Sequence, residues 1–250
     1  MLRVESDGPV LRVTLNRPEV RNAFNDALIA ALTEAFATVP SGTRVVVLSG
    51  EGKAFCAGGD LEWMRRAAAY TEEQNYQDAL KLSGLFRAVA ECRAAVVAQI
   101  HGAAFGGGAG LVAASDIAVA HEDTQFAFSE VRLGLIPGTI SPYVIPKIGA
   151  GHARSLFTTG ESFGALRALQ IGLIHACGPD VAALTEEKVK WLLSVGPNAV
   201  YEAKRIVLEY PLPAEECARR LAAARASEEG KEGVAAFLER RKAVFSIPRD

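Results

Sequence analysis

Two glycine-rich loops constrain this chain more than any other feature of its sequence. "CAGGD" occupies positions 56–60, and "HGAAFGGGAGL" occupies positions 101–111. The short apolar runs "RVVVLSG" at 44–50 and "AAVVAQI" at 94–100 precede them and have the β-branched composition typical of buried strands. Each loop is therefore predicted to follow directly after a strand. Its glycines leave the backbone there uncovered by side chains.

Further patterns predict an α/β fold. Asn25 can accept a hydrogen bond as the cap of a helix whose apolar face repeats every four residues through Leu28, Leu32 and Phe36. A second helical pattern surrounds 75–91. The remaining strand predictions are "LRVTLN" at 11–16 and "DIAVA" at 116–120. Strands and helices that alternate in this way indicate an α/β core.

After Pro197 the sequence becomes helical and rich in Ala, Glu, Arg and Lys. We therefore predict a core over 1–195 and a helical region over 196–250. An apolar stripe is predicted on one helical face of this region, facing either its own chain or another subunit. The stripe comprises Val234, Phe237, Leu238, Val244 and Phe245.

Composition narrows the classes of partner and cofactor. The chain has 250 residues, half of them hydrophobic, with a formal net charge of -2, so neither a nucleic-acid nor a membrane partner is expected. Its four cysteines form no C-x-x-C pair, which predicts no metal site and a cytoplasmic location with reduced thiols. The first residues and the terminal "SIPRD" match no targeting signal.

Familiar glycine and catalytic motifs do not fit. "GEGKAF" lacks the spacing of a phosphate-binding P-loop, and "FGGGAGL" ends in Leu111 where a dinucleotide motif needs glycine. "HEDTQ" lacks the second histidine of a zinc protease, and no G-x-S-x-G sequence occurs. These comparisons remove support for nucleotide, zinc-protease and esterase chemistry.

The backbone N–H groups of the two loops offer another chemistry. The first N–H groups of a helix have no intrahelical acceptor, and glycine lets a ligand approach them closely. Two such turns that converge can hold one oxygen as it becomes negative, which is an oxyanion hole. The alternative is that the glycines serve only close packing or turn geometry.

Five segments together resemble the enoyl-CoA hydratase/isomerase family, whose members are also called crotonases. They are "LNRPEVRNAFN" at 15–25, "GKAFCAGGDL" at 52–61, "HGAAFGGGAGLVAASDIAVA" at 101–120, "FSEVRLGLIPG" at 128–138 and "FLERRKAVF" at 237–245. The resemblance spans nearly the whole chain. It implies a spiral of β-β-α units over 1–195, with the CoA and acyl site, and oligomerisation through the helical region over 196–250. It also implies an acyl-CoA thioester substrate whose CoA is no separate cofactor, and a homotrimer or a dimer of trimers.

The resemblance also implies roles for individual residues. Gly59 and Gly107 match the two oxyanion donors, with Gly107 at the start of a helix over "GGAGLVAAS", and Glu130 matches the acid/base glutamate. CoA contacts are implied for Arg21, Ala23, Ala57, Asp60 and Leu61. The alternatives are a solvated arginine for Arg21 and a helix cap for the Asp60 side chain, and we favour the cap.

One position departs from the family pattern. Typical hydratases carry a second glutamate where this chain has Gly110. Water would therefore need Glu130 together with backbone, with a hydroxyl such as Ser141 or Tyr143, or with a residue from elsewhere in the chain. A double-bond isomerase needs Glu130 alone. Thioesterase, decarboxylase or dehalogenase variants, and a CoA-binding protein without turnover, also stay open.

The loop "GLIPGTISPYV" at 134–144 bears on this choice. It is similar to a bacterial subgroup that hydrates branched, carboxylated enoyl-CoA esters such as methylglutaconyl-CoA or isohexenylglutaconyl-CoA. We therefore expect an enoyl-CoA hydratase that acts on the 2,3 double bond, with the isomerase as the alternative.

Overall fold

The computed structural model describes residues 1–248 and confirms the predicted α/β class. The last two residues of the "SIPRD" segment lie outside the described residues. The strands are β1 (Leu2–Asp7), β2 (Val10–Leu15), β3 (Val45–Gly50), β4 (Ala95–Ile100), β5 (Ala103–Phe105), β6 (Ile117–His121), β7 (Gln125–Ala127), β8 (Ser162–Gly164) and β9 (Ala176–Gly178). The α-helices are α1 (Asp26–Ala37), α2 (Leu61–Ala67), α3 (Glu72–Ala90), α4 (Gly107–Ala114), α5 (Ser141–Thr159), α6 (Ala165–Gln170), α7 (Val181–Ser194), α8 (Pro197–Leu208), α9 (Ala214–Ala226) and α10 (Glu228–Leu238). Short 3₁₀ helices cover Pro18–Val20 and Glu130–Leu133.

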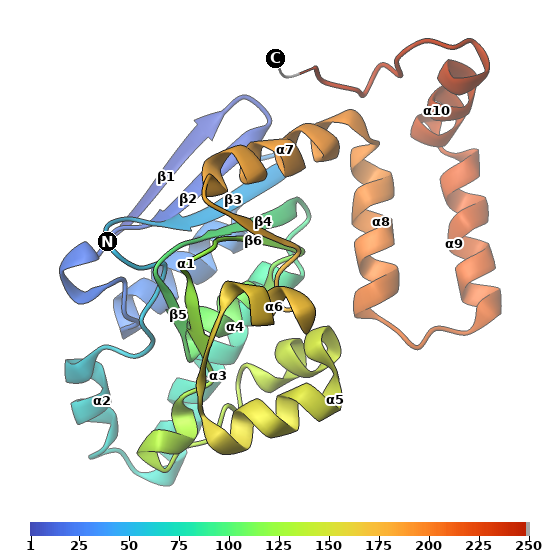
Figure 1. The fold of residues 1–250 in the computed structure, drawn as a ribbon. Coiled ribbons are helices and arrows are strands. Elements are labelled where there is room, and N and C mark those ends of the chain that lie inside the picture. The colour runs from blue at the N-terminus through green and yellow to red at the C-terminus, as the bar shows by residue number, and fades with distance from the viewer. Residues whose placement is uncertain (249–250) are drawn as a thin grey trace.

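Two sheets form the frame of the molecule (Figure 1). The larger has the order β1-β2-β3-β4-β6-β9, and every pair after β1 and β2 is parallel. The smaller has the order β5-β7-β8, and a bridge between Cys56 and Ala104 extends it. Successive chain segments thus give one strand to the large sheet, a shorter strand to the small sheet, and then a helix.

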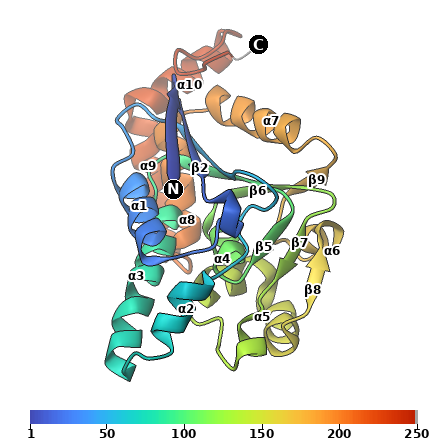
Figure 2. The ribbon, with the colours of Figure 1, turned by 90° about the vertical axis from the view of Figure 1, so that its left-hand side faces the viewer.

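Helices cover both faces of the large sheet. Val45, Val47 and Val97 point to one face and pack with Val189 and Leu193 of α7. The alternate residues of the same strands point to the other face, into the main core. Figure 2 shows α1 and α3 side by side on the side of the main core, with α7 apart from them.

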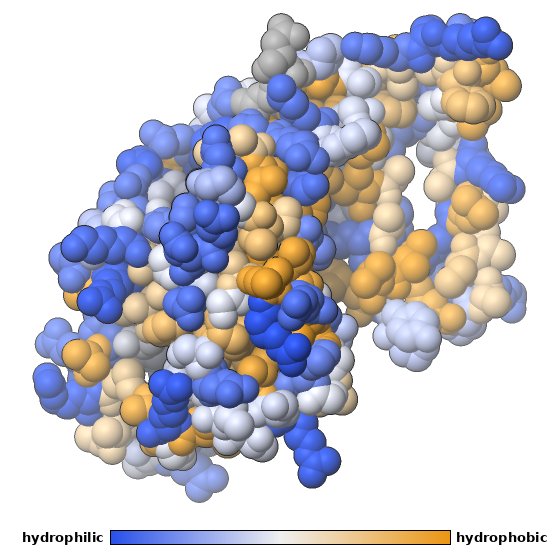
Figure 3. All heavy atoms as spheres, viewed as in Figure 1, coloured by the Kyte–Doolittle hydropathy of each residue, from blue (hydrophilic) through white to orange (hydrophobic). Residues whose placement is uncertain are grey.

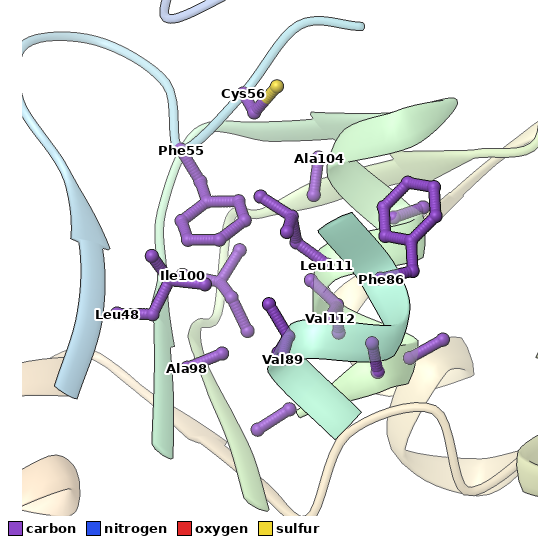
Figure 4. Packing of buried hydrophobic residues seen from close by; sticks show 14 of the residues in the cluster. Leu48, Phe55, Cys56, Phe86, Val89, Ala98, Ile100, Ala104, Leu111 and Val112 are labelled. Carbon is purple, nitrogen blue, oxygen red and sulfur yellow. The ribbon is translucent and has the colours of Figure 1, made fainter. Parts of the chain in front are cut away.

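Helix α4 lies in the middle of the main core. Leu111 and Val112 of α4 pack against Phe86 and Val89 of α3, close to Phe55 (Figure 4). The helix is buried along nearly its whole length, so small residues are needed where neighbouring elements approach it. Its N-terminus is therefore fixed by packing on several sides.

The C-terminal helices α8, α9 and α10 project away from the sheets (Figure 1). The chain then returns, because Arg44 donates to the carbonyl of Phe245 at 2.5 Å and the Ile247 N–H donates to the carbonyl of Leu193 at 2.9 Å. Helix α8 begins at Pro197, although the proposed domain boundary itself stays a prediction.

The predicted apolar stripe of this region is partly wrong. Helix α10 ends at Leu238, and Arg240 has a positive φ of 55°, so Val244 and Phe245 do not continue its face. The Phe245 ring instead lies 3.5 Å from where a Cβ on Gly233 would stand. Val234, Phe237 and Leu238 are exposed on the helix.

Candidate active site

The two glycine loops meet in the structure. A Cβ placed on Gly108 would lie 2.5 Å from the carbonyl oxygen of Cys56, so the second loop is in direct backbone contact with the first. Phe24 joins them from the other side. Its backbone pairs with Gly59 in a parallel bridge, and its ring lies 2.5 Å from where a Cβ on Gly107 would stand. Only glycine fits at 107 and 108 without displacing these neighbours.

The bridge also sets the direction of the Gly59 N–H. The Phe24 N–H donates to the carbonyl of Gly58 at 2.7 Å, and the Asp60 N–H donates to the carbonyl of Phe24 at 2.8 Å. Because successive peptide groups of an extended segment face opposite edges, the N–H of Gly59 points away from Phe24. Among the described residues, no protein acceptor takes this N–H.

Gly107 is the first residue of α4, as the sequence predicted. Gly106 precedes it with a positive φ of 50°, which a side chain tolerates poorly. No hydrogen bond within the described part of the chain uses the Gly107 N–H, as expected at the start of a helix. The positive end of the helix dipole adds to the attraction of this N–H for an anion.

Glu130 lies beside the second loop. One carboxylate oxygen of Glu130, Oε1, is 3.3 Å from where a Cβ on Gly106 would stand, and Gly106 directly precedes Gly107. The other oxygen, Oε2, is buried and has no hydrogen-bond partner in the described residues. Burial raises the pKa of Glu130 above its ordinary value, because removal from water disfavours the charged form. A carboxyl in this state is suited to give or take a proton.

Gly110 is enclosed by side chains. A Cβ at this position would lie 2.4 Å from Cγ2 of Ile140 and 2.8 Å from Cζ of Phe86. Both neighbours are fully buried, so a second carboxylate cannot be placed at 110 without moving the core. The side chains around Gly110 therefore fill the space that a glutamate at this position would need.

The two hydroxyl candidates have different surroundings. Ser141 Oγ donates to the carbonyl of Gly138 at 2.9 Å, so its proton is already engaged. The Tyr143 ring lies 6.1 Å from the ring of Phe86, and burial raises the pKa of its hydroxyl. Neither residue has a contact with Glu130 among those that the structure records.

The predicted CoA residues surround the first loop. Ala23 is buried, Arg21 is exposed, and the side chain of Leu61 is exposed at the start of α2. The Ala57 N–H donates to the Arg21 carbonyl at 3.0 Å, and the Asp60 N–H donates to the carbonyl of Phe24. Contacts of these two residues with a ligand must therefore use other groups.

The Asp60 side chain caps α2, as we expected. Its Oδ1 accepts from the N–H of Glu62 at 2.9 Å and of Trp63 at 3.4 Å. Its second partner, Arg17, donates to Oδ2 at 2.8 Å and was not among the predicted site residues. The buried Asn22 and the ring of Phe24 were not predicted either, although all three belong to the segment at 15–25 that carries the family resemblance.

Other chemistries lack support at this site. Burial raises the pKa of Cys56 to about 12, so its thiol is not an activated nucleophile. Within residues 1–248, no group of three or more His, Cys, Asp or Glu side chains could hold a metal ion.

No helix of this part of the chain is long and apolar enough to cross a membrane.

Comparisons with known proteins agree on one family. The Enoyl-CoA hydratase/isomerase family model matches residues 5–247. A Thermus thermophilus protein with the provisional name enoyl-CoA hydratase is 34% identical over 254 residues, which cover 98% of this chain and 100% of that protein.

Solved structures extend this likeness to three dimensions. Pseudomonas aeruginosa AtuE superposes with a TM-score of 0.94 at 36% identity, covering 98% of this chain and 99% of AtuE. The crystal structure of an enoyl-CoA hydratase from Shewanella pealeana gives a TM-score of 0.93 at 35% identity, covering 97% of this chain and 95% of that chain.

Proposed function

Because the chain belongs to the enoyl-CoA hydratase/isomerase family, we propose that it is an enoyl-CoA hydratase that adds water across the 2,3 double bond of an enoyl-CoA thioester. The fold is the predicted crotonase spiral, which the superpositions confirm. The observation that carries the proposal is the buried, unpartnered Oε2 of Glu130 beside the loop that presents Gly107.

In this mechanism the N–H groups of Gly59 and Gly107 bind the thioester carbonyl oxygen. Addition of water at C3 moves electrons onto that oxygen as an enolate forms, and fixed donors stabilise the new charge. Removing one such donor from an enzyme typically costs about 3 kcal/mol of transition-state stabilisation. Glu130 then donates its proton to C2 and recovers one from the added water, so the carboxyl is regenerated.

The CoA part of the substrate is assigned to the edge of the first loop. Arg21 is exposed and can meet a phosphate, and Ala23 and Leu61 border the loop. Ala57 contributes its carbonyl oxygen, since its N–H is used within the protein. Asp60 acts mainly through its cap of α2, which shapes the surface there.

A second function has its own support. Gly110 is closed in by Ile140 and Phe86, so the site holds one carboxylate where a two-carboxylate hydratase has two. A double-bond isomerase moves one proton between carbons and needs one base. The likeness of the loop at 134–144 to hydratases of branched, carboxylated acyl-CoA esters is our reason to place hydration first.

The assembly and location complete the proposal. We assign a homotrimer or a dimer of trimers, with α8–α10 at the interface. Val207, Phe237 and Leu238 are 75%, 82% and 73% exposed, which is unusual for such large apolar side chains. Figure 3 shows hydrophobic residues around the opening between α8 and α9. The four cysteines are free, which fits a cytoplasmic location.

Product analysis tests the reaction. The purified protein is incubated with crotonyl-CoA and with methylglutaconyl-CoA while absorbance of the conjugated thioester is followed and products are weighed. A gain of one water supports hydration, and rearrangement at constant mass supports the isomerase. Binding of CoA esters with neither change would contradict both and leave a binding protein without turnover.

Replacing Glu130 by Gln tests its role. The amide cannot exchange a proton in the same way, so we expect kcat to fall by about 10²- to 10⁴-fold while the Kd for CoA stays unchanged. The matched control is Glu122→Gln, because Glu122 is exposed and lies outside the site. Equal activity of the Glu130→Gln variant and the control would reject Glu130 as the acid/base.

A further inference from the structure

A polar cluster joins the segment before α1 to the first glycine loop. Its members are Arg17, Asn22 and Asp60, and none of their side chains is predicted above to take part in catalysis. Asn22 is fully buried, and the side chains of Arg17 and Asp60 are only 16% and 11% exposed. Buried polar groups of this kind fix geometry when every member is hydrogen-bonded.

Arg17 and Asp60 form the centre of the cluster. Arg17 Nη2 donates to Asp60 Oδ2 at 2.8 Å, and Arg17 Nη1 donates to the carbonyl of Ala23 at 2.6 Å. Asp60 uses its other oxygen, Oδ1, to cap α2. The hydrogen bond from Arg17, followed by those from the Glu62 and Trp63 N–H groups, holds the pKa of Asp60 below its ordinary value despite partial desolvation.

Asn22 ties the same segment to the beginning of the loop. Its Oδ1 accepts from the Arg17 N–H at 2.8 Å, and its Nδ2 donates to the carbonyls of Glu51 at 2.9 Å and Ala54 at 2.8 Å. Asn22 holds a positive φ of 56°, a conformation that asparagine tolerates better than most residues. Two segments distant in sequence are thus clamped together on both sides of Gly59.

Gly58 and Gly59 need such a clamp. Glycine has the widest choice of backbone conformations, Gly58 has a φ of 100°, and Gly59 is exposed. Nothing in the two residues themselves fixes where the Gly59 N–H points. The constraints next to Gly59 come from Phe24, whose backbone brackets it, and from Asp60, the next residue in the chain.

We propose that Arg17 is a positioning residue for the oxyanion hole, acting through Asp60 and the carbonyl of Ala23 to aim the N–H of Gly59 at the thioester oxygen. The inference rests on the proposed function, because it assumes that a thioester carbonyl binds at Gly59 and Gly107. An oxyanion donor works only within about 2.7–3.1 Å of the oxygen, and a displacement of about 1 Å can cost about 10²-fold in rate.

Substitutions can separate this role from the helix cap. Asparagine caps helices about as well as aspartate, so Asp60→Asn keeps the acceptor for α2 but loses the ion pair with Arg17. Arg17→Met keeps the aliphatic stem and removes both donors. Arg17→Lys retains the charge, but a single ammonium cannot reproduce the two-armed contact with Asp60 and Ala23.

The matched control is Arg12→Met. Arg12 forms a partly exposed ion pair with Glu186 at 2.5 Å and lies on β2, outside the predicted site. This variant also loses one arginine and one ion pair. An effect of losing any arginine ion pair would therefore also be seen in Arg12→Met.

The test measures the stretching frequency of the bound thioester carbonyl by vibrational spectroscopy. The ligand is butyryl-CoA labelled with ¹³C at that carbonyl. This saturated ester binds without turnover, and its carbonyl stretching frequency falls when donors polarise the bond. We expect a clear downward shift on binding to the wild-type protein and to Arg12→Met. In Arg17→Met and Asp60→Asn the shift should shrink to about half, since one of the two donors is misaimed. Arg17→Lys should lie in between.

Kinetics provide the second readout. We expect kcat for the enoyl-CoA substrate that the wild-type protein converts to fall about 10- to 100-fold in Arg17→Met and Asp60→Asn. The Kd for butyryl-CoA should change less than about threefold. A full frequency shift and control-level kcat in either variant would overturn the inference. If Arg17→Met does not fold, Asp60→Asn alone decides. A wild-type protein that binds butyryl-CoA without any frequency shift would instead overturn the oxyanion hole of the proposed function.

Discussion

Adding one methyl group at Gly110 should destabilise the protein, although the same change elsewhere in a helix should stabilise it. In Gly110→Ala the new Cβ would stand 2.4 Å from Ile140 Cγ2 and 2.8 Å from Phe86 Cζ. Carbon atoms normally pack at about 3.5–4.0 Å, so the fully buried neighbours must move. Such overpacking typically costs about 1–3 kcal/mol.

The backbone contribution has the opposite sign. Replacing glycine by alanine within a helix gains about 0.5–1 kcal/mol. The net expectation for Gly110→Ala is therefore a loss of up to about 2.5 kcal/mol in the free energy of unfolding. Gly84 of α3 is the matched control, because a Cβ there meets no atom within 4 Å. Gly84→Ala should gain the full backbone contribution.

Urea unfolding at equal protein concentration measures both changes. With a slope of about 2–3 kcal/mol/M, the Gly110→Ala midpoint should fall by up to about 1 M, and that of Gly84→Ala should rise slightly. Gly110→Glu should be less stable still, since it adds a buried charge. A Gly110→Ala variant as stable as Gly84→Ala would refute the argument that packing excludes a second carboxylate.

Burial raises the pKa of Glu130, and hydration needs its protonated carboxyl as the donor to C2, so kcat for hydration should fall as pH rises through that pKa; loss of kcat as pH falls through it would favour isomerisation, which begins with removal of a proton by the carboxylate. Gly107→Pro deletes a donor N–H and should lower kcat by about 10²- to 10³-fold, and unchanged kcat in a folded variant would contradict the role of Gly107. Light scattering should give the mass of a trimer or hexamer, whereas a monomer would contradict the proposed interface.

The sequence was sufficient for the elements that local chemistry defines. The runs at 44–50, 94–100 and 116–120 became β3, β4 and β6 within about one residue, because β-branched residues bounded by turns favour buried strands. Asn25 caps α1 through the Leu28 N–H, as predicted. Gly107 begins α4 because three consecutive glycines leave a strand before an apolar helical run.

Elements that depend on distant partners could not be predicted in this way. β5, β7 and β8 have three residues each, too short for a periodic pattern. The Arg17–Asp60 pair joins residues 43 positions apart, and no local pattern links them. The closure around Gly110 likewise depends on Ile140 and Phe86, which come from other parts of the chain.

The oxyanion hole is the central claim, and a crystal structure with bound butyryl-CoA tests it most directly. The account predicts that the thioester oxygen lies about 2.7–3.1 Å from both the Gly59 and the Gly107 nitrogen, with a Glu130 oxygen near C2. A thioester oxygen held by other groups, or by only one of these two N–H groups, would contradict it.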